Sequence, residues 1–438
     1  MTDKFNDRLQ KAKFPPIIAS DKGVAWLNGG HLWLYRNDLS DSLNGDFQSA
    51  WSSGDIVDVF SRKGTYLGSG FYNAAGQIAV RLLSNNRNET FDSAFWLRRL
   101  RYAVEYRKQL KLLNAEGACR LIYGEADGFP GLTCDRFNDV LVIEIFSLGI
   151  AKIWPELQAQ LLQLLREEYS IRIRLVYEKS LGPLRAKEGL ETFAGLRYCA
   201  AASADKEKEL LPVGIVENGI NFSVDFVNGQ KTGYFLDQRE NRLFLQRIAA
   251  GKNVLECFTH TGSFALNALK GGAEHVLAVD ISTTALNQAK INAALNPALD
   301  SRKITWMKAD VFNLLTALNE HRTGEDWDKA AALGKFDMIL LDPPAFAKTR
   351  EVKNSAYKGY LNINYQAMRL LPRGGYLVTT SCSHFMPEAD FSKMLAEAAR
   401  MADVKLKLLA RKEQAPDHPI LLSMPETAYL KTYFLQII

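Results

Sequence analysis

A cysteine and an aspartate each follow an apolar, strand-like run in the C-terminal part of the chain. Cys382 ends the run GGYLVTTSC, and Asp342 begins the tripeptide DPP after FDMILL. Carbon 5 of cytosine is a poor nucleophile, but a thiolate that adds to carbon 6 makes carbon 5 enamine-like and able to attack a sulfonium methyl. Cys382 can serve as that nucleophile, while Asp342 can hold N3 or N4 of the ring. A buried structural cysteine is the commonest alternative, but Ser381, Ser383 and His384 make this turn polar.

The prolines after Asp342 predict a place for a planar base. Pro343 and Pro344 stiffen the turn and remove two amide donors, which leaves carbonyls to accept from an exocyclic amino group. Phe346 can stack on the face of the base. A simple strand terminator is the alternative role of two prolines. A base that reacts at carbon 5 must be splayed out or unpaired, which favours RNA as the substrate. The base that removes the C5 proton stays unassigned.

An earlier strand and turn predict a pocket for a nucleoside without a phosphate. The strand ending at Phe258 runs into THTGSF, and the next strand ends at Asp280, where a carboxylate can accept from both ribose hydroxyls. The turn has one glycine, Gly262, where a dinucleotide fingerprint has three, which argues against NAD and FAD. S-adenosylmethionine has only a carboxylate and an amine at that end, so one glycine and a helix N-terminus suffice.

The third strand of this series, ITWMKAD, ends in Asp310, which can accept from the adenine amino group or simply cap a helix. The ordered series of acids favours the cofactor site. The motif NGQKTG at 228–233 lacks the upstream glycine of a P-loop, so an ATPase is excluded. The predicted cofactor-binding residues of this region are Phe258, Thr259, Gly262, Ser263, Phe264, Asp280, Asp310 and Asp342.

These residues need an α/β scaffold. From about residue 214 onward, strand-like and helix-like patterns alternate, which predicts a largely parallel, Rossmann-like sheet with helices on both faces. Residues 119–211 mix strand runs with an amphipathic stretch and predict an α+β module. Residues 14–85 contain short apolar runs between turn signals, the pattern of a small β-rich domain.

A helix is predicted over 91–114, with Asp92 or Ser93 as its cap, because its apolar residues recur every three or four positions. This helix has two interpretations, a solvated surface or one that follows RNA phosphates through Arg98 and Arg101. Its outer face is expected to carry Arg98, Arg99, Arg101, Arg107, Lys108 and Lys111 against Glu105.

The bulk composition narrows the class of protein. The chain has 438 residues, 47% hydrophobic and 24% charged, which predicts two or three globular domains. A net charge of +5 permits an anionic partner without identifying one. The five cysteines contain no CxxC pair, so neither disulfides nor a zinc site is expected, and a reducing cytoplasm fits. The charged N-terminus and the absence of a run of roughly 20 apolar residues predict an unprocessed protein outside the membrane.

Three longer stretches, together with SCS and DPP, carry a resemblance. They are GGHLWLYRNDL at 29–39, GEADGFPGLTCDRF at 124–137 and NGQKTGYFLDQRENR at 228–242. Over nearly its whole length the chain resembles the class I S-adenosylmethionine-dependent 23S rRNA cytosine-C5 methyltransferases that carry an N-terminal PUA domain. In this resemblance Cys382 matches the nucleophile position and Asp342 the fourth motif.

The resemblance implies four segments, namely a charged tail at 1–13, a PUA-like RNA-binding domain at 14–88, a basic helix with a central α+β domain at 89–212, and the methyltransferase domain at 213–438. It also implies a 23S rRNA substrate, naked or in an early assembly intermediate, with a homodimer as one expected state. Lys231 is expected to bind the substrate, and the residues implied near the cofactor or the base are Tyr234, Asp237 and Arg239. A packed, salt-bridged connector is their alternative role. Another branch of RNA cytosine methyltransferases has a second cysteine where this chain has Ala345, so product release has no assigned residue.

Competing functions stay open. A guanine methyltransferase would use DPP but need no thiol, so Cys382 discriminates against it. A non-catalytic RNA-binding or ribosome-assembly factor would not need the acids Asp280, Asp310 and Asp342. A nicotinamide-dependent oxidoreductase would need the missing glycines.

Overall fold

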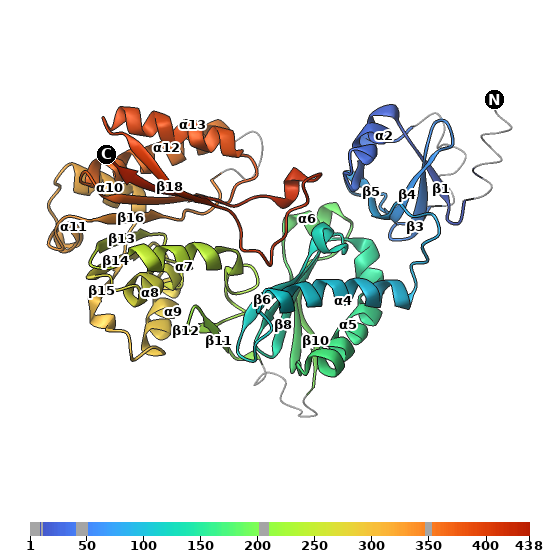
Figure 1. Cartoon of the computed structure of the whole chain (residues 1–438), viewed down its shortest axis with the longest axis horizontal. Helices are drawn as coiled ribbons and strands as arrows, with labels where there is room; N and C mark the ends of the chain where they lie inside the picture. Colours follow the sequence, from blue (N-terminus) through green and yellow to red (C-terminus); the bar gives the residue numbers. More distant parts are fainter. Residues whose placement is uncertain (1–8, 10–11, 41–50, 201–209, 347–352) are drawn as a thin grey trace. The chain divides into compact units, whose positions relative to one another are not determined.

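The computed structural model describes residue 9 and residues 12–40, 51–200, 210–346 and 353–438 (Figure 1). The chain divides into two compact units. The N-terminal unit comprises Met1–Ile215, Val224–Tyr234 and Pro416–Thr427. The C-terminal unit comprises Val216–Ser223, Phe235–Ala415 and Ala428–Ile438. Each unit is described by itself below.

The first part of the N-terminal unit contains a five-stranded sheet and the helix α2 (Asp21–Asn28). The sheet order is β1-β3-β4-β5-β2, with β1 and β3 parallel and the other pairs antiparallel. Ser20 caps α2 by accepting from the amide of Gly23. Buried aliphatic side chains such as Leu34, Val59 and Val80 form its core, as the short apolar runs predicted. The strands are β1 (Pro16–Ala19), β2 (Trp33–Tyr35), β3 (Ile56–Ser61), β4 (Tyr66–Tyr72) and β5 (Ile78–Ser84).

The second part of the N-terminal unit is an α+β module whose sheet has the order β10-β9-β8-β7-β6. Its long helices are α4 (Ser93–Gln109), capped by Asp92, and α5 (Leu148–Tyr169), and both contribute to one core with β6, β7 and β8. The helix predicted over 91–114 is therefore confirmed but shorter, because Lys111 adopts a left-handed φ of 60° that ends it. Its other elements are β6 (Ala118–Tyr123), η3 (Gly124–Asp127), β7 (Leu132–Phe137), β8 (Val140–Ile145), β9 (Leu175–Ser180), α6 (Pro183–Lys187) and β10 (Phe193–Cys199).

The C-terminal unit contains a seven-stranded sheet in the order β15-β14-β13-β16-β17-β19-β18. The first five strands in this order are parallel, and β19 runs antiparallel to both β17 and β18. A parallel, Rossmann-like sheet was predicted, and it is confirmed. The strands are β13 (Asn253–Cys257), β14 (His275–Asp280), β15 (Ile304–Lys308), β16 (Met338–Leu341), β17 (Tyr376–Ser381), β18 (Leu406–Lys412) and β19 (Lys431–Ile437). A separate two-stranded sheet pairs β11 (Val213–Glu217) with β12 (Ile220–Val224).

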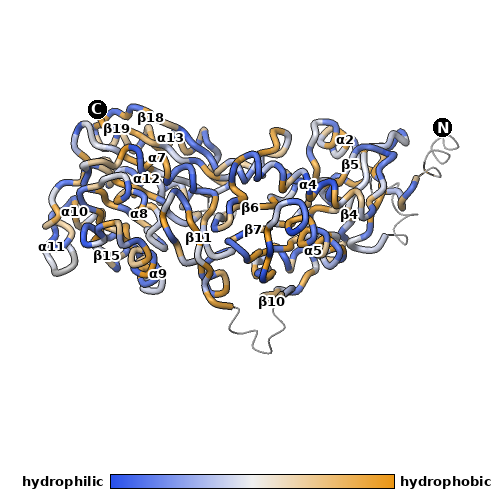
Figure 2. Tube along the Cα trace, turned by 60° about the horizontal axis from the view of Figure 1, so that its bottom comes forward, coloured by the Kyte–Doolittle hydropathy of each residue, from blue (hydrophilic) through white to orange (hydrophobic). Residues whose placement is uncertain are grey.

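Side chains alternate between the two faces of each strand, and this divides the helices into two groups. Leu255 and Cys257 of β13 belong to the core that includes residues of α10, α12 and α13. Glu256, between them, points to the opposite face. The helices are α7 (Arg239–Ile248), α8 (Ser263–Lys270), α9 (Thr283–Ala294), α10 (Val311–Asn319), α11 (Glu325–Ala331), α12 (Lys353–Leu370) and α13 (Glu388–Met401). Hydrophobic and hydrophilic segments alternate along the chain, as the orange and blue stretches in Figure 2 show.

The chain leaves β13 for β14 and β15 on one side and returns to β16 on the other. Open α/β sheets bind ligands outside the carboxyl ends of the strands at such a reversal. The turn after β13 and the DPP segment after β16 both lie there. None of the helices within the described ranges has the length and apolar character required to span a membrane.

Candidate active site

The turn between β13 and α8 has an unusual backbone. Phe258, His260 and Gly262 have positive φ values of 66°, 51° and 76°. Such values cost free energy in residues other than glycine, and a run of them in one turn is a feature of strained, functional loops. At Gly262 a side chain is also excluded by space, because a Cβ would lie 2.9 Å from the Trp306 ring. The single glycine of the sequence motif is therefore required by both conformation and packing.

Asp280 ends β14 beside this turn, with its carboxylate held by two amides. Its Oδ2 accepts from the His260 amide at 2.9 Å, and its Oδ1 accepts from the Ser282 amide at 2.8 Å. Each carboxylate oxygen has a second lone pair. The carboxylate is thus oriented and can still accept from the two hydroxyls of a ribose.

Asp310 follows β15 and caps α10, since its Oδ1 accepts from the amide of Asn313 at 2.9 Å. The helix-cap role considered for this residue is confirmed. A contact of its carboxylate with an adenine amino group stays a prediction.

The site contains an acid that sequence reasoning missed. Glu256 is 2% exposed, and the Thr259 hydroxyl donates to its Oε2 at 2.6 Å. Burial raises the pKa of Glu256 to about 8, and the carboxylates of Asp342 and Asp280 add to the effect. The signal was a charged residue inside the apolar run VLECF. The neighbouring carboxylates of Asp280 and Asp342 suit a ligand with positive charges, and S-adenosylmethionine carries both a sulfonium and an ammonium group.

Asp342 is oriented by a relay of amides. Gln238 Nε2 donates to Asp342 Oδ1 at 3.0 Å, and Asn241 Nδ2 donates to Gln238 Oε1 at 2.6 Å. Asn241 also donates to the Thr432 hydroxyl at 3.1 Å. The Asn241 amide donates to the oxygen of the Gln238 side chain, so the Gln238 NH2 group is the one that faces the Asp342 carboxylate.

Cys382 follows β17 and is partly exposed. A buried phenol, Tyr360 of α12, lies within electrostatic range of both Cys382 and Asp342. Burial raises the pKa of Tyr360, and the negative charges of the Cys382 thiolate and the Asp342 carboxylate raise it further. Both predicted catalytic residues are therefore within electrostatic range of the same hydroxyl.

The predicted base-binding segment lies next to this pair. Pro343 is buried and Pro344 is exposed. The Phe346 ring packs on Tyr360, with centroids 4.6 Å apart, and on Phe312 at 5.7 Å. Only the remaining surface of Phe346 is available to a base, so its stacking role stays a prediction.

The segment before α7 has structural partners. Asp237 accepts from the Tyr429 hydroxyl at 2.6 Å, and Arg239 lies 3.5 Å from the Glu217 carboxylate. The salt-bridged connector considered for these two residues is therefore present, and their contact with cofactor or base stays a prediction. Lys231 and Tyr234 belong to the N-terminal unit.

The face of α4 differs from the expected basic surface. Arg98 pairs with Glu89 at 2.7 Å, and Arg101 donates to Glu168 through its Nε at 3.0 Å. Arg107 was expected on the outer face, but this is wrong, because it is fully buried and pairs with Asp127 at 2.7 Å. Only part of the circumference of α4 faces solvent, so a cation on the opposite side, such as Arg107, lies in the interior.

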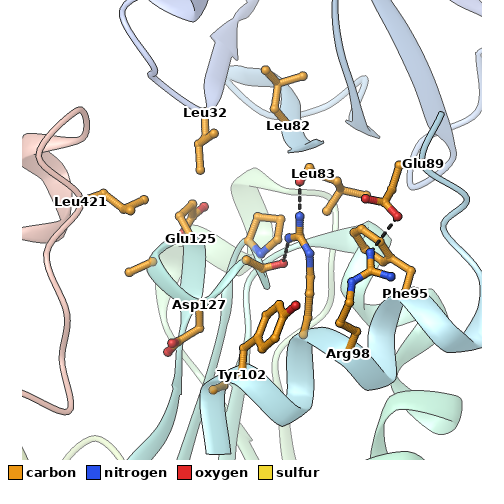
Figure 3. Close-up of a pocket in the computed structure, with 15 residues that line it drawn as sticks. Leu32, Leu82, Leu83, Glu89, Phe95, Arg98, Tyr102, Glu125, Asp127 and Leu421 are labelled. Atoms are coloured by element: carbon orange, nitrogen blue, oxygen red, sulfur yellow. Dashed lines mark hydrogen bonds and ion pairs between the residues drawn. The ribbon is translucent and has the colours of Figure 1, made fainter. Parts of the chain in front are cut away.

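A cavity of about 520 Å³ lies beside Arg98 in the N-terminal unit, and residues that line it are drawn in Figure 3. Tyr102 of α4 is 66% exposed at this cavity. Arg99 donates to the carbonyl of Gly128 at 2.6 Å and to that of Leu83, and burial lowers the pKa of Arg99 to about 10. Arg99 is therefore a structural cation rather than part of a solvated stripe.

Comparisons with known proteins agree with this arrangement. A family model described as S-adenosylmethionine-dependent methyltransferase matches residues 193–435, and a PUA-like domain model matches residues 17–85. Ribosomal RNA large subunit methyltransferase I of Aeromonas salmonicida is 41% identical over 86% of this chain and 89% of its own length. The protein of that name from Shewanella denitrificans is 39% identical over 92% of this chain and 94% of its own length. The solved structure of SMU.776, complexed with SAH, has a TM-score of 0.76 at 22% identity and covers 96% of this chain and 99% of its own. That likeness shows the fold.

Proposed function

Because this chain belongs to the ribosomal RNA large subunit methyltransferase I family of S-adenosylmethionine-dependent enzymes, we propose that it methylates carbon 5 of a cytosine in 23S rRNA. The observation that carries the cytosine-C5 assignment is the pair Asp342 and Cys382, which directly follow the adjacent parallel strands β16 and β17. A thiol in this place has no use in a guanine methyltransferase.

In this proposal the turn after β13 holds the cofactor. Asp280 binds the ribose hydroxyls and Asp310 the adenine amino group, while the acids near Glu256 attract the positive groups. When bound, S-adenosylmethionine supplies an electrophilic methyl group. The proposed cofactor-binding set is Tyr234, Asp237, Arg239, Phe258, Thr259, Gly262, Ser263, Phe264, Asp280, Asp310 and Asp342.

The chain's own residues then activate the base. The Cys382 thiolate forms a bond to C6 with its electron pair, and the C5–C6 π electrons become available at C5. Asp342 holds N3 or N4 and favours the ring protonated at N3, with a proton that solvent supplies and takes back when the thiolate leaves. S-adenosylmethionine, held by the turn after β13, would supply the methyl group that C5 accepts. A base removes the C5 proton, the C5–C6 double bond re-forms, and the thiolate leaves C6.

Substrate binding is proposed for six residues. Pro343, Pro344 and Phe346 would hold the cytosine, and Lys231, Arg98 and Arg101 the RNA backbone. We propose functional domain limits of 14–88, 89–212 and 213–438. The first of these would bind RNA as a PUA-like domain. The substrate is naked RNA or an early assembly intermediate.

The test is methyl transfer from labelled S-adenosylmethionine to unmodified 23S rRNA, with identification of the product nucleoside. Wild type is expected to give 5-methylcytidine, and Cys382→Ala to give none while still binding SAH. Cys199→Ala is a matched control, because Cys199 is partly exposed but lies in β10 of the N-terminal unit. An active Cys382→Ala variant or a methylated guanine would reject the C5 mechanism. A wild type that binds RNA but transfers no methyl group would favour an assembly factor.

A further inference from the structure

Lys431 holds the turn that follows Cys382. It is the first residue of β19, and Ser381, the residue before Cys382, is its partner across the antiparallel pair. Its Nζ donates to the carbonyl of Ser383 at 2.8 Å and to the carbonyl of Met386 at 2.9 Å. An ammonium group has three N–H donors, and two of them close this turn. A cation is thus built into the loop that carries the thiol.

The charge of Lys431 also interacts with Cys382. Burial lowers the pKa of Lys431 to about 8, whereas the negative charges of the Cys382 thiolate and the Glu388 carboxylate raise it. The interaction between two charges is mutual. A thiolate at Cys382 stabilises the protonated form of Lys431. By the same free energy, a protonated Lys431 stabilises the thiolate form of Cys382.

Other charged and titratable groups face this pair from neighbouring elements. The Tyr360 hydroxyl of α12 interacts electrostatically with the Cys382 thiolate and with the Asp342 carboxylate after β16. Glu388 of α13 is engaged by Arg411 and by the Tyr433 hydroxyl, the latter at 3.1 Å. His384 is exposed, and its ring centroid lies 5.8 Å from that of Tyr429. Lys431 is therefore the cation whose charge acts on Cys382, and Glu388 is the carboxylate whose charge acts on Lys431.

We propose that Lys431 is a positioning residue for Cys382, whose ammonium group fixes the turn after β17 and stabilises the thiolate form of this cysteine. The attack on a pyrimidine rests on the proposed function, but the stabilised thiolate belongs to the resting protein. It can therefore be measured without RNA or cofactor.

The experiment is alkylation of the full chain by iodoacetamide at a series of pH values, with the Cys382 peptide quantified by mass spectrometry. Because the thiolate is the reactive form, the rate reports its fraction. Wild-type Cys382 is expected to reach half its maximal rate below the ordinary cysteine value of about 8.5. In Lys431→Met the midpoint should rise, with an about tenfold slower reaction at pH 7 for each unit of rise. Lys431→Arg, which keeps the charge, should stay close to wild type.

Cys199 in the same samples is the internal control, and its rates should not change between variants. The proposal is overturned if wild type and Lys431→Met have the same profile. It is also overturned if the wild-type midpoint lies at or above about 8.5, a result that needs no variant to fold. Failure of the proposed function is a separate outcome. Cys382→Ala would then still form 5-methylcytidine, whatever the alkylation profiles show.

Discussion

Glu256, in β13, is a buried acid whose protonation state affects the charge beside the turn between β13 and α8. Its carboxyl group is buried in the sheet, next to Asp280 and Asp342, and the pKa of Glu256 is raised to about 8. In the unfolded chain a glutamate titrates near pH 4.3. Between these two values the folded state keeps a proton that the unfolded state has lost.

The stability of the C-terminal unit should therefore fall as pH rises from about 4.5 to about 8 and level off above. The protonated form stabilises the fold below the unfolded pKa, and this contribution is lost progressively up to the folded pKa. The slope expected from one proton is about 1.4 kcal/mol per pH unit. Glu256→Gln, which is neutral at all pH values, should show a flatter dependence of its thermal midpoint. Parallel curves for wild type and variant would mean that Glu256 titrates normally.

Residues of the site differed in how well the sequence could predict them. Cys382, Asp342 and Asp280 stand at strand ends, where local pattern alone marks them. Gln238 and Lys431 do not, since each contacts a residue far away in the chain, 104 positions from Gln238 to Asp342 and 48 from Lys431 to Ser383. Long-range partners of this kind have no local sequence signal.

At the scale of elements, the turn between β13 and α8 depends on glycine for two separable reasons. Gly262 has a φ of 76°, and a Cβ there would lie 2.9 Å from the Trp306 ring and 3.0 Å from the Ala289 Cβ. Gly251 has a similar φ of 66°, but nothing lies within 4 Å of its Cβ position. Replacing either glycine by alanine therefore has the same conformational cost. Only at Gly262 would the added Cβ also clash with neighbouring side chains.

Gly251→Ala should lose about 1 kcal/mol of stability through backbone conformation alone. Gly262→Ala should lose more, about 2–4 kcal/mol, because Trp306 must also move. Its affinity for SAH should fall at least tenfold, while that of Gly251→Ala should stay unchanged. Calorimetric titration with SAH and thermal unfolding measure the two effects. Equal SAH affinity in all three proteins would remove this turn from the cofactor site.

Elements were predictable where burial imposes a simple pattern. The parallel strands are covered on both faces, so they read as apolar runs such as FDMILL between helical stretches. The limits of α4 were less clear, because the backbone of Lys111, rather than a proline or glycine, ends it early. Which cations of α4 are buried depends on acids contributed by other elements, such as Asp127 of η3.

On the scale of the whole N-terminal unit, buried ion pairs join the first sheet to the α+β module. Arg81 of β5 binds Glu125 at 2.9 Å and Glu188 at 3.0 Å, and Trp33 donates to Glu125 at 2.8 Å. These side chains come from strands of the first sheet and from segments beside the second. These contacts hold the PUA-like domain and the module that contains α4 together, so an RNA could contact both at once.

Reversing the charges of Arg98 and Arg101 on α4 should weaken RNA binding and reduce its dependence on salt. Each phosphate contact on single-stranded RNA contributes about 0.7 to the slope of log K against log salt, so the double variant should lose up to about 1.4. The loss should be smaller if Glu89 and Glu168 keep these arginines engaged in the complex. Arg166→Glu with Arg302→Glu is the matched control, because both are exposed, ion-paired arginines and the change in net charge is the same. Filter binding across salt concentrations decides the matter, and identical slopes for the two double variants would place α4 outside the RNA interface.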